Sequence, residues 1–157
     1  PNEHYFYLQE TLGISGEINY EKSNSVKLTN PLVELDYSFL RLAILDIIIN
    51  NADRKAGHIL RDQQDNIWGI DNGLSFHTER KLRTVIWDYS GLEIPPDWCS
   101  ELENLHTLIK DSSNDHHVFS ILSDREVSAM LTRLENLIEN GILPDMFYER
   151  CVPWPLI

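Results

Sequence analysis

The chain has 157 residues, which is enough for one hydrophobic core and too few for two full domains. Its 25 acidic and 13 basic side chains give a net charge of −12, which argues against indiscriminate binding to nucleic acid or anionic membranes. The two cysteines, Cys99 and Cys151, do not have the spacing of a zinc site. So few cysteines do not indicate a disulfide framework, and they suit a protein of the reducing cytoplasm. We therefore expect one cytoplasmic unit, mainly α with some β structure (α+β).

The first thirty residues predict an arm or loop, because an aromatic start (4–8) gives way to a polar stretch rich in Gly, Ser and Asn. They contain no G-x-G-x-x-G phosphate loop. A helix is predicted from Pro31 or Leu32 to Ile49 or Asn50. Its apolar run, residues 39–49, falls short of the roughly 20 residues that cross a bilayer. We expect a buried core helix and no stable membrane insertion.

A β-hairpin is predicted next, with strands at 58–61 and 67–70 joined by the polar turn 62–66. Asp53 precedes the first strand and Asp71 follows the second. Because a hairpin brings its first and last residues together, we expect these two carboxylates to lie close together at its open end. Two acids in that arrangement suggest metal-assisted chemistry.

After Gly73, residues 78–83 form a basic segment, residues 84–89 a short strand or helix, and Ile94-Pro95-Pro96 a break. Two capping boxes predict two further helices, one starting at Ser100 and Glu103, the other at Ser123 and Glu126. The second helix, residues 124–140, is amphipathic and is ended by Gly141 and Pro144. The intervening loop, 111–117, has two histidines that we assign to the surface. The apolar tail, 151–157, is expected to dock on the body or on a partner.

The motifs around the hairpin resemble a known group of enzymes. Asp53 is followed five residues later by His58, and Asp71 opens the sequence Asp-Asn-Gly. Together, over residues 40–95, they resemble the catalytic and metal loops of the phosphatidylinositol 3-/4-kinase-like group, closest to type II phosphatidylinositol 4-kinases, and also a related bacterial family. The resemblance implies that residues 31–157 form the C-terminal lobe of a protein-kinase-like fold, after an N-terminal arm at 1–30. No lobe that clamps a nucleotide is expected in this chain.

The resemblance also implies roles for the site residues. Asp53 and Arg54 would be catalytic, Lys55 and His58 would contact ATP, and Asp71 with His58 would hold Mg²⁺ for phosphate transfer to a hydroxyl. Residues 41–83 carry a net charge of +1 against −13 elsewhere, so this is the least repulsive place for a phosphate. His58 stands where these kinases usually carry Asn, and imidazole is a poorer Mg²⁺ ligand than an amide oxygen.

Plainer interpretations stay open beside these. Asp-Asn-Gly is a common turn tripeptide, and Asp53 is also suited to capping a helix end or closing a turn. Arg54 is equally suited to a structural ion pair, and Lys55 to a solvated loop. The basic segment 78–83 either meets an anionic substrate or is a solvated loop. The acceptor is a lipid headgroup, a protein or a small molecule. The alternative function is a catalytically inactive pseudokinase or interaction module that binds a partner or forms a homo-oligomer.

Overall fold

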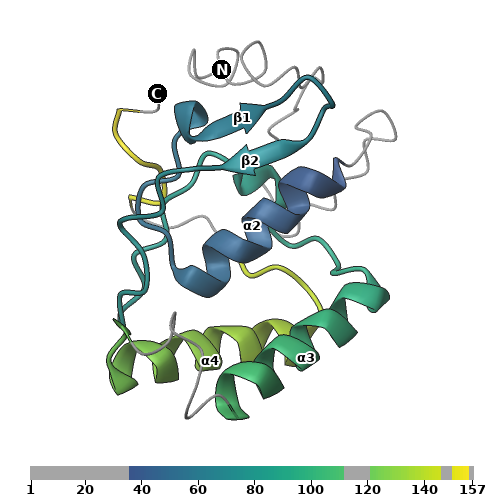
Figure 1. Ribbon diagram of the computed structural model, residues 1–157, viewed down its shortest axis with the longest axis vertical. Coiled ribbons are helices and arrows are strands. Elements are labelled where there is room, and N and C mark those ends of the chain that lie inside the picture. The colour runs from purple at the N-terminus through teal and green to yellow at the C-terminus, as the bar shows by residue number, and fades with distance from the viewer. Residues whose placement is uncertain (1–35, 112–120, 146–149, 156–157) are drawn as a thin grey trace, which may run out of the picture.

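The computed structural model describes residues 36–111, 121–145 and 150–155. In these ranges it contains three α-helices and one two-stranded antiparallel sheet, which confirms the α+β expectation. Figure 1 shows helix α2 (Tyr37–Ile49) between the hairpin and the pair formed by α3 (Pro96–Asp111) and α4 (Asp124–Asn140). The predicted N-terminal arm and most of the 111–117 loop lie outside the described residues.

Helix α2 is the buried core helix that the sequence predicts. The helix is polar at few positions and is buried on most sides, with contacts to β2, to the 3-10 turn η2 (Trp87–Tyr89) and to α4. Its start differs from the prediction: the Asp36 carboxylate caps the helix by accepting from the Ser38 N–H at 2.9 Å. Residues 31–35 of the predicted helix are outside the described ranges. No helix in the part of the chain that the structure describes is long and apolar enough to cross a bilayer.

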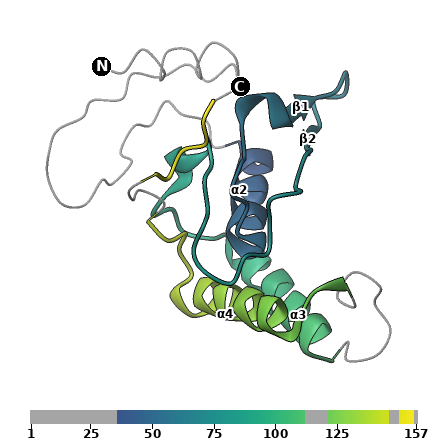
Figure 2. The ribbon, with the colours of Figure 1, turned by 90° about the vertical axis from the view of Figure 1, so that its left-hand side faces the viewer.

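The hairpin has the predicted strands, trimmed by one residue each. Strand β1 (Ile59–Arg61) pairs with β2 (Ile67–Gly69), so that Leu60 lies opposite Trp68. His58 belongs instead to the 3-10 turn η1 (Ala56–His58), which leads into β1. In the second view the hairpin stands alongside the upper half of α2 (Figure 2). The chain therefore enters the hairpin from the end of α2 and leaves it beside the same helix.

Asp62 organises the hairpin turn. Its carboxylate accepts from the backbone N–H groups of Gln64 and Asn66, from the Asn66 amide and from Trp68 Nε1, all at 2.8–3.0 Å. These hydrogen bonds, the one from Trp68 foremost, lower the pKa of Asp62 to about 2. The carboxylate thus remains charged over the range in which proteins normally operate. The turn fixes the register that sets the two ends of the hairpin side by side.

Helices α3 and α4 pack on one another beneath α2. The prediction for α4 is confirmed: both halves of the Ser123–Glu126 capping box are present, and Gly141 ends the helix with a left-handed φ of 63°. The predicted capping box at Ser100 and Glu103 is wrong, because α3 already begins at Pro96. A proline suits the first turn of a helix, whose N–H groups have no intrahelical acceptor. The predicted break is thus the start of the helix.

The segment after the hairpin returns across the end of α2. Arg54 and Thr84 form an isolated parallel bridge, and Trp87–Tyr89 form η2, which agrees with the predicted short strand or helix. The tail also contacts this segment, because the Cys151 carbonyl accepts from the Thr84 N–H at 3.1 Å. Pro153 is buried. The expectation that the tail docks on the body is confirmed for residues 151–153, whereas Trp154 is 80% exposed.

Gly69 marks the closest approach of the hairpin to α2. A Cβ atom there would lie 2.6 Å from Leu42 Cδ1 and 3.3 Å from Arg54 Nη2. We predict that Gly69→Ala lowers the free energy of unfolding by about 1–3 kcal/mol, because Leu42 is buried and the buried Arg54 is held by its hydrogen bonds. Gly57→Ala is the matched control, since a Cβ at Gly57 meets nothing within 4 Å. Urea denaturation measures both, and equal effects would contradict this packing.

Asp88 in η2 is half-buried, and burial raises its pKa to about 6. The folded chain then binds a proton more tightly than the unfolded chain, whose Asp titrates near 4. Stability is therefore expected to fall as the pH rises from about 4 to 6 and to stay at the lower level above that. At pH 7 Asp88→Asn should be more stable than wild type by up to roughly 3 kcal/mol, with no difference below pH 4. Glu103→Gln, on an exposed face, should show neither effect in thermal unfolding from pH 4 to 8.

Candidate functional site

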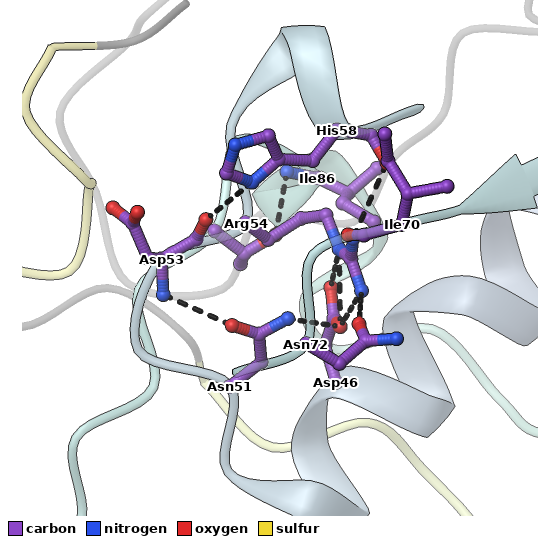
Figure 3. Close-up of polar contacts among 9 residues, drawn as sticks. Asp46, Asn51, Asp53, Arg54, His58, Ile70, Asn72 and Ile86 are labelled. Atoms are coloured by element: carbon purple, nitrogen blue, oxygen red, sulfur yellow. Dashed lines mark hydrogen bonds and ion pairs between the residues drawn. The ribbon is translucent and has the colours of Figure 1, made fainter. Parts of the chain in front are cut away.

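Arg54 lies at the centre of the candidate site and is fully buried. Its Nε donates to both Asp46 carboxylate oxygens at 2.9 and 3.2 Å, and its Nη2 donates to Asp46 Oδ1 at 2.8 Å and to Asn72 Oδ1. Its Nη1 donates to the carbonyl oxygens of His58 at 3.3 Å and Ile70 at 2.7 Å. Figure 3 shows these hydrogen bonds around the guanidinium. All five N–H donors of the guanidinium are therefore engaged.

These contacts connect every element that carries a predicted site residue. Asp46 belongs to α2, His58 precedes β1, Ile70 follows β2, and Asn72 is in the Asp-Asn-Gly turn. The Arg54 backbone adds two more links, because its N–H donates to the Arg83 carbonyl and its carbonyl accepts from the Val85 N–H. One side chain and its backbone thus hold the loop after α2, both ends of the hairpin and the returning segment in one arrangement.

The Asp46 carboxylate is as buried as its partner. Burial raises its pKa, while the hydrogen bonds and charge of Arg54 and the Asn51 amide act in the opposite direction. Asn51 bridges the pair to the next loop: its Nδ2 donates to Asp46 Oδ1, and its Oδ1 accepts from the Asp53 N–H, both at 3.0 Å. The network therefore fixes the backbone of Asp53 as well as that of the hairpin.

Asp53 itself points out of this network. Figure 3 shows its carboxylate directed away from the Arg54 guanidinium. The side chain is 25% exposed, and Lys55 Nζ lies 3.1 Å from its Oδ2. Lys55 is accordingly not the solvated loop charge of the plainer interpretation. It neutralises the acid and holds it at the surface of the loop.

His58 joins the two acidic loops. Its Nδ1 lies 3.0 Å from the Asp53 carbonyl oxygen, and its Nε2 lies 3.5 Å from Asp71 Oδ2. Asp71 is 65% exposed and adopts a left-handed φ of 53°, which suits the turn between β2 and Gly73. The structure thus connects the Asp53 loop to the Asp71 turn through His58, which contacts the Asp53 backbone carbonyl and lies near the Asp71 carboxylate. That the Asp53 and Asp71 carboxylates act at one site stays a prediction.

The predicted catalytic role of Arg54 needs correction. A guanidinium with no exposed surface and no free N–H donor has nothing left to offer a substrate. The structural ion pair that the sequence left open is what the geometry contains. Arg54 is a positioning residue beneath the site.

The structure also fixes the segment that follows the Asp-Asn-Gly turn. The Asn50 amide, at the left-handed end of α2, donates to the carbonyls of His77 and Glu79 and accepts from the Lys81 N–H, at 2.7–2.9 Å. Arg133 of α4 donates to the Ile48 and His77 carbonyls. The segment's path is therefore set by α2 and α4.

Two of the three basic side chains of this segment, Arg80 and Lys81, have protein partners. Lys81 Nζ lies 3.2 Å from the Glu79 carboxylate, and the Arg80 guanidinium donates to the Asp145 carbonyl. The expectation that they meet an anionic substrate gains no support from this geometry.

Sequence reasoning missed three residues of the network: Asp46, Asn50 and Asn72. Asp46 lies inside the apolar run 39–49, and no role was predicted for it. Its signal was available, because an acid in the middle of a buried helix needs a cationic partner, and the nearest cation in the following loop is Arg54. No comparable feature of the sequence indicates the roles of Asn50 and Asn72, because the side chain of an asparagine in a turn usually hydrogen-bonds to the backbone of that same turn.

The donor set was tested against the magnesium that the resemblance implies. Over the ranges that the structure describes, no three or more His, Cys, Asp or Glu side chains gather as a metal cage. Mg²⁺ bound to nucleotides does not require one, because it takes one or two protein ligands and fills its shell with phosphates and water. The exposed Asp71 carboxylate fits that mode, whereas the His58 imidazole beside it is a poorer Mg²⁺ ligand than an oxygen.

Comparison with known proteins adds one relative. A Mycobacterium tuberculosis protein named Protein Rv2133c is 33% identical to this chain over 120 residues. The matched residues are 76% of this chain and 43% of the relative, so the chain spans less than half of that relative's length. No family model matches the sequence. Because the relative's name states no activity, function is argued from the site.

The Arg54–Asp46 pair allows a direct test. We predict that Arg54→Met lowers the free energy of unfolding by about 3–5 kcal/mol, because it leaves a buried carboxylate without its cation. Arg61→Met is the control: Arg61 is half exposed, pairs with Asp36 and Asp65 at 3.6 and 3.4 Å, and should contribute less than about 1 kcal/mol. Guanidinium denaturation measures both. Similar losses for the two variants would contradict the central role of Arg54.

Proposed function

We propose that this chain is the C-terminal lobe of a kinase-like phosphotransferase, which transfers phosphate from Mg-ATP to a hydroxyl. The observation that carries the proposal is the position of His58 between the two acidic loops, with one ring nitrogen on the Asp53 carbonyl and the other facing Asp71. In phosphoryl transfer the protein contributes mainly positioning and charge neutralisation. The reaction therefore needs one acid that orients the acceptor hydroxyl and a second acid nearby that holds the metal ion.

Each residue then has a separate task. Asp53 would accept the proton of the attacking hydroxyl, and Lys55, 3.1 Å from that carboxylate, would orient it and neutralise negative charge on the phosphate. Asp71 and His58 would hold the divalent cation, which neutralises charge on the nucleotide phosphates when it is bound. Arg54, buried beneath the site, would hold the loops that carry these groups in position.

The acceptor class follows less directly from the site. A hydroxyl-bearing acceptor is required by the role of Asp53, and it can belong to a lipid headgroup, a protein or a small molecule. Because Arg80 and Lys81 already have protein partners, we do not assign them to an anionic acceptor. Thin-layer analysis of labelled phosphate transferred to inositol lipids and to protein would separate these acceptors.

A second candidate function is favoured by the outer face of the hairpin. Leu60 and Trp68, directly opposite one another, and Ile70 next to them are 43–57% exposed. An apolar cluster of this kind is typical of a surface that contacts another protein or lobe. An inactive interaction module or homo-oligomer would use this face without transferring phosphate. Size-exclusion chromatography with and without Mg-ATP tests it.

Asp71→Asn provides the decisive test of nucleotide binding. Asn tolerates the left-handed backbone at this position, so the turn should survive while the charged metal ligand is lost. We predict that the affinity for Mg-ATP, measured by isothermal titration calorimetry on the full protein, falls by at least about tenfold. His77→Ala, at an exposed loop position, should change it little. Equal affinities for the two variants would refute the assignment.

A further inference from the structure

One contact of the His58 ring decides which nitrogen carries the hydrogen when the imidazole is neutral. Its Nδ1 lies 3.0 Å from the Asp53 carbonyl oxygen, and a carbonyl oxygen only accepts hydrogen bonds. The hydrogen of a neutral imidazole is therefore on Nδ1, and its lone pair is on Nε2. The side chain is 17% exposed, so the protein rather than solvent sets its orientation.

That lone pair faces a carboxylate at an informative distance. Nε2 and Asp71 Oδ2 are 3.5 Å apart, which is longer than the hydrogen bond between His106 and Glu135 at 2.9 Å. Two ligands that each lie about 2.0–2.2 Å from one cation, at roughly 90–110°, are separated by about 3–3.5 Å. The His58–Asp71 spacing matches two neighbouring ligands of a single ion.

The surroundings of His58 are those of a metal ligand. Histidines that bind metals usually donate their other ring N–H to a carbonyl or carboxylate, which fixes the ring and makes the ligating nitrogen more basic. The Asp53 carbonyl supplies that contact, and Arg54 and Asn51 hold the loop that carries it. The pair His106–Glu135, on the faces of α3 and α4, has no such backbone contact among its described interactions.

We propose that His58 Nε2 and Asp71 form a mixed nitrogen and oxygen site that binds a first-row transition cation, of the Co²⁺ or Mn²⁺ class, in preference to Mg²⁺. Hard Mg²⁺ favours oxygen ligands, whereas imidazole nitrogen favours transition cations. The proposal rests on the site of the proposed function and assigns its cation. An amide oxygen in place of the His58 nitrogen would remove this preference for a transition cation.

Cobalt titration of the full chain without nucleotide tests the proposal. We expect Co²⁺ to bind at least about tenfold more tightly than Mg²⁺, and its visible absorption to change as imidazole replaces water. In His58→Asn the ratio of the two affinities should fall by at least about tenfold, and the absorption change should disappear. His106→Asn, which removes the other histidine–carboxylate pair, should match the wild type. Circular dichroism verifies that each variant is folded.

The results separate this inference from the proposed function. An unchanged Co²⁺ to Mg²⁺ ratio in His58→Asn, or no Co²⁺ preference in the folded wild type, overturns the cation assignment. If Mg-ATP binding still depends on Asp71 in that case, the phosphotransferase proposal stands. Co²⁺ binding that depends on His58, together with Mg-ATP binding that does not depend on Asp71, supports the site and overturns the phosphotransferase instead.

Discussion

The buried ion pair of Arg54 and Asp46 is the constraint on which the rest of the site depends. Two charges taken out of water are stabilised only if their hydrogen bonds are complete, and here the five guanidinium donors all have acceptors. The acceptors come from a helix, both ends of a hairpin and a turn. Satisfying one buried cation therefore requires four pieces of chain to meet, which is a positional role that a hydrophobic side chain could not fill.

Backbone conformation around the pair supports the same view. Asn50, Asp71 and Phe76 adopt left-handed φ values of 57°, 53° and 68°, a region that costs free energy for residues with side chains. Each is held by a separate contact: Asn50 by its three hydrogen bonds to the 77–81 segment, Phe76 by its N–H on the Ile49 carbonyl, and the turn of Asp71 by the bond from Arg54 to Asn72. Asn50 ends α2, Asp71 closely follows β2, and Phe76 lies against the last residue of α2, so all three lie where the chain turns around the loops that carry Asp53, His58 and Asp71.

Much of this could be predicted because the signals are local. Helix α4 has a capping box, an amphipathic stripe and a glycine end, and the hairpin has a polar turn between two apolar strands, so each is defined within its own residues. That the Asp53 loop and the Asp71 turn are neighbours follows from hairpin geometry, and His58 connects them. The start of α3 was misplaced because Pro95-Pro96 marks a break and a helix start equally well.

The role of Arg54 was left open because its partner, Asp46, lies eight residues away in another element, and only the fold decides whether both are buried. Asn50 contacts residues about thirty positions on, which no local pattern indicates.

Hydrogen–deuterium exchange of Arg54→Lys against wild type tests the central claim most directly, because lysine keeps the charge and loses the planar fork. The account predicts that protection is lost together at the amides of Ala52, Arg54, Ile70 and Val85, which lie in the loops that Arg54 joins, while α4 keeps its protection. Faster exchange confined to the Asp53 loop, or equal loss throughout α4, would contradict a single buried cation that holds both acidic loops at one mouth.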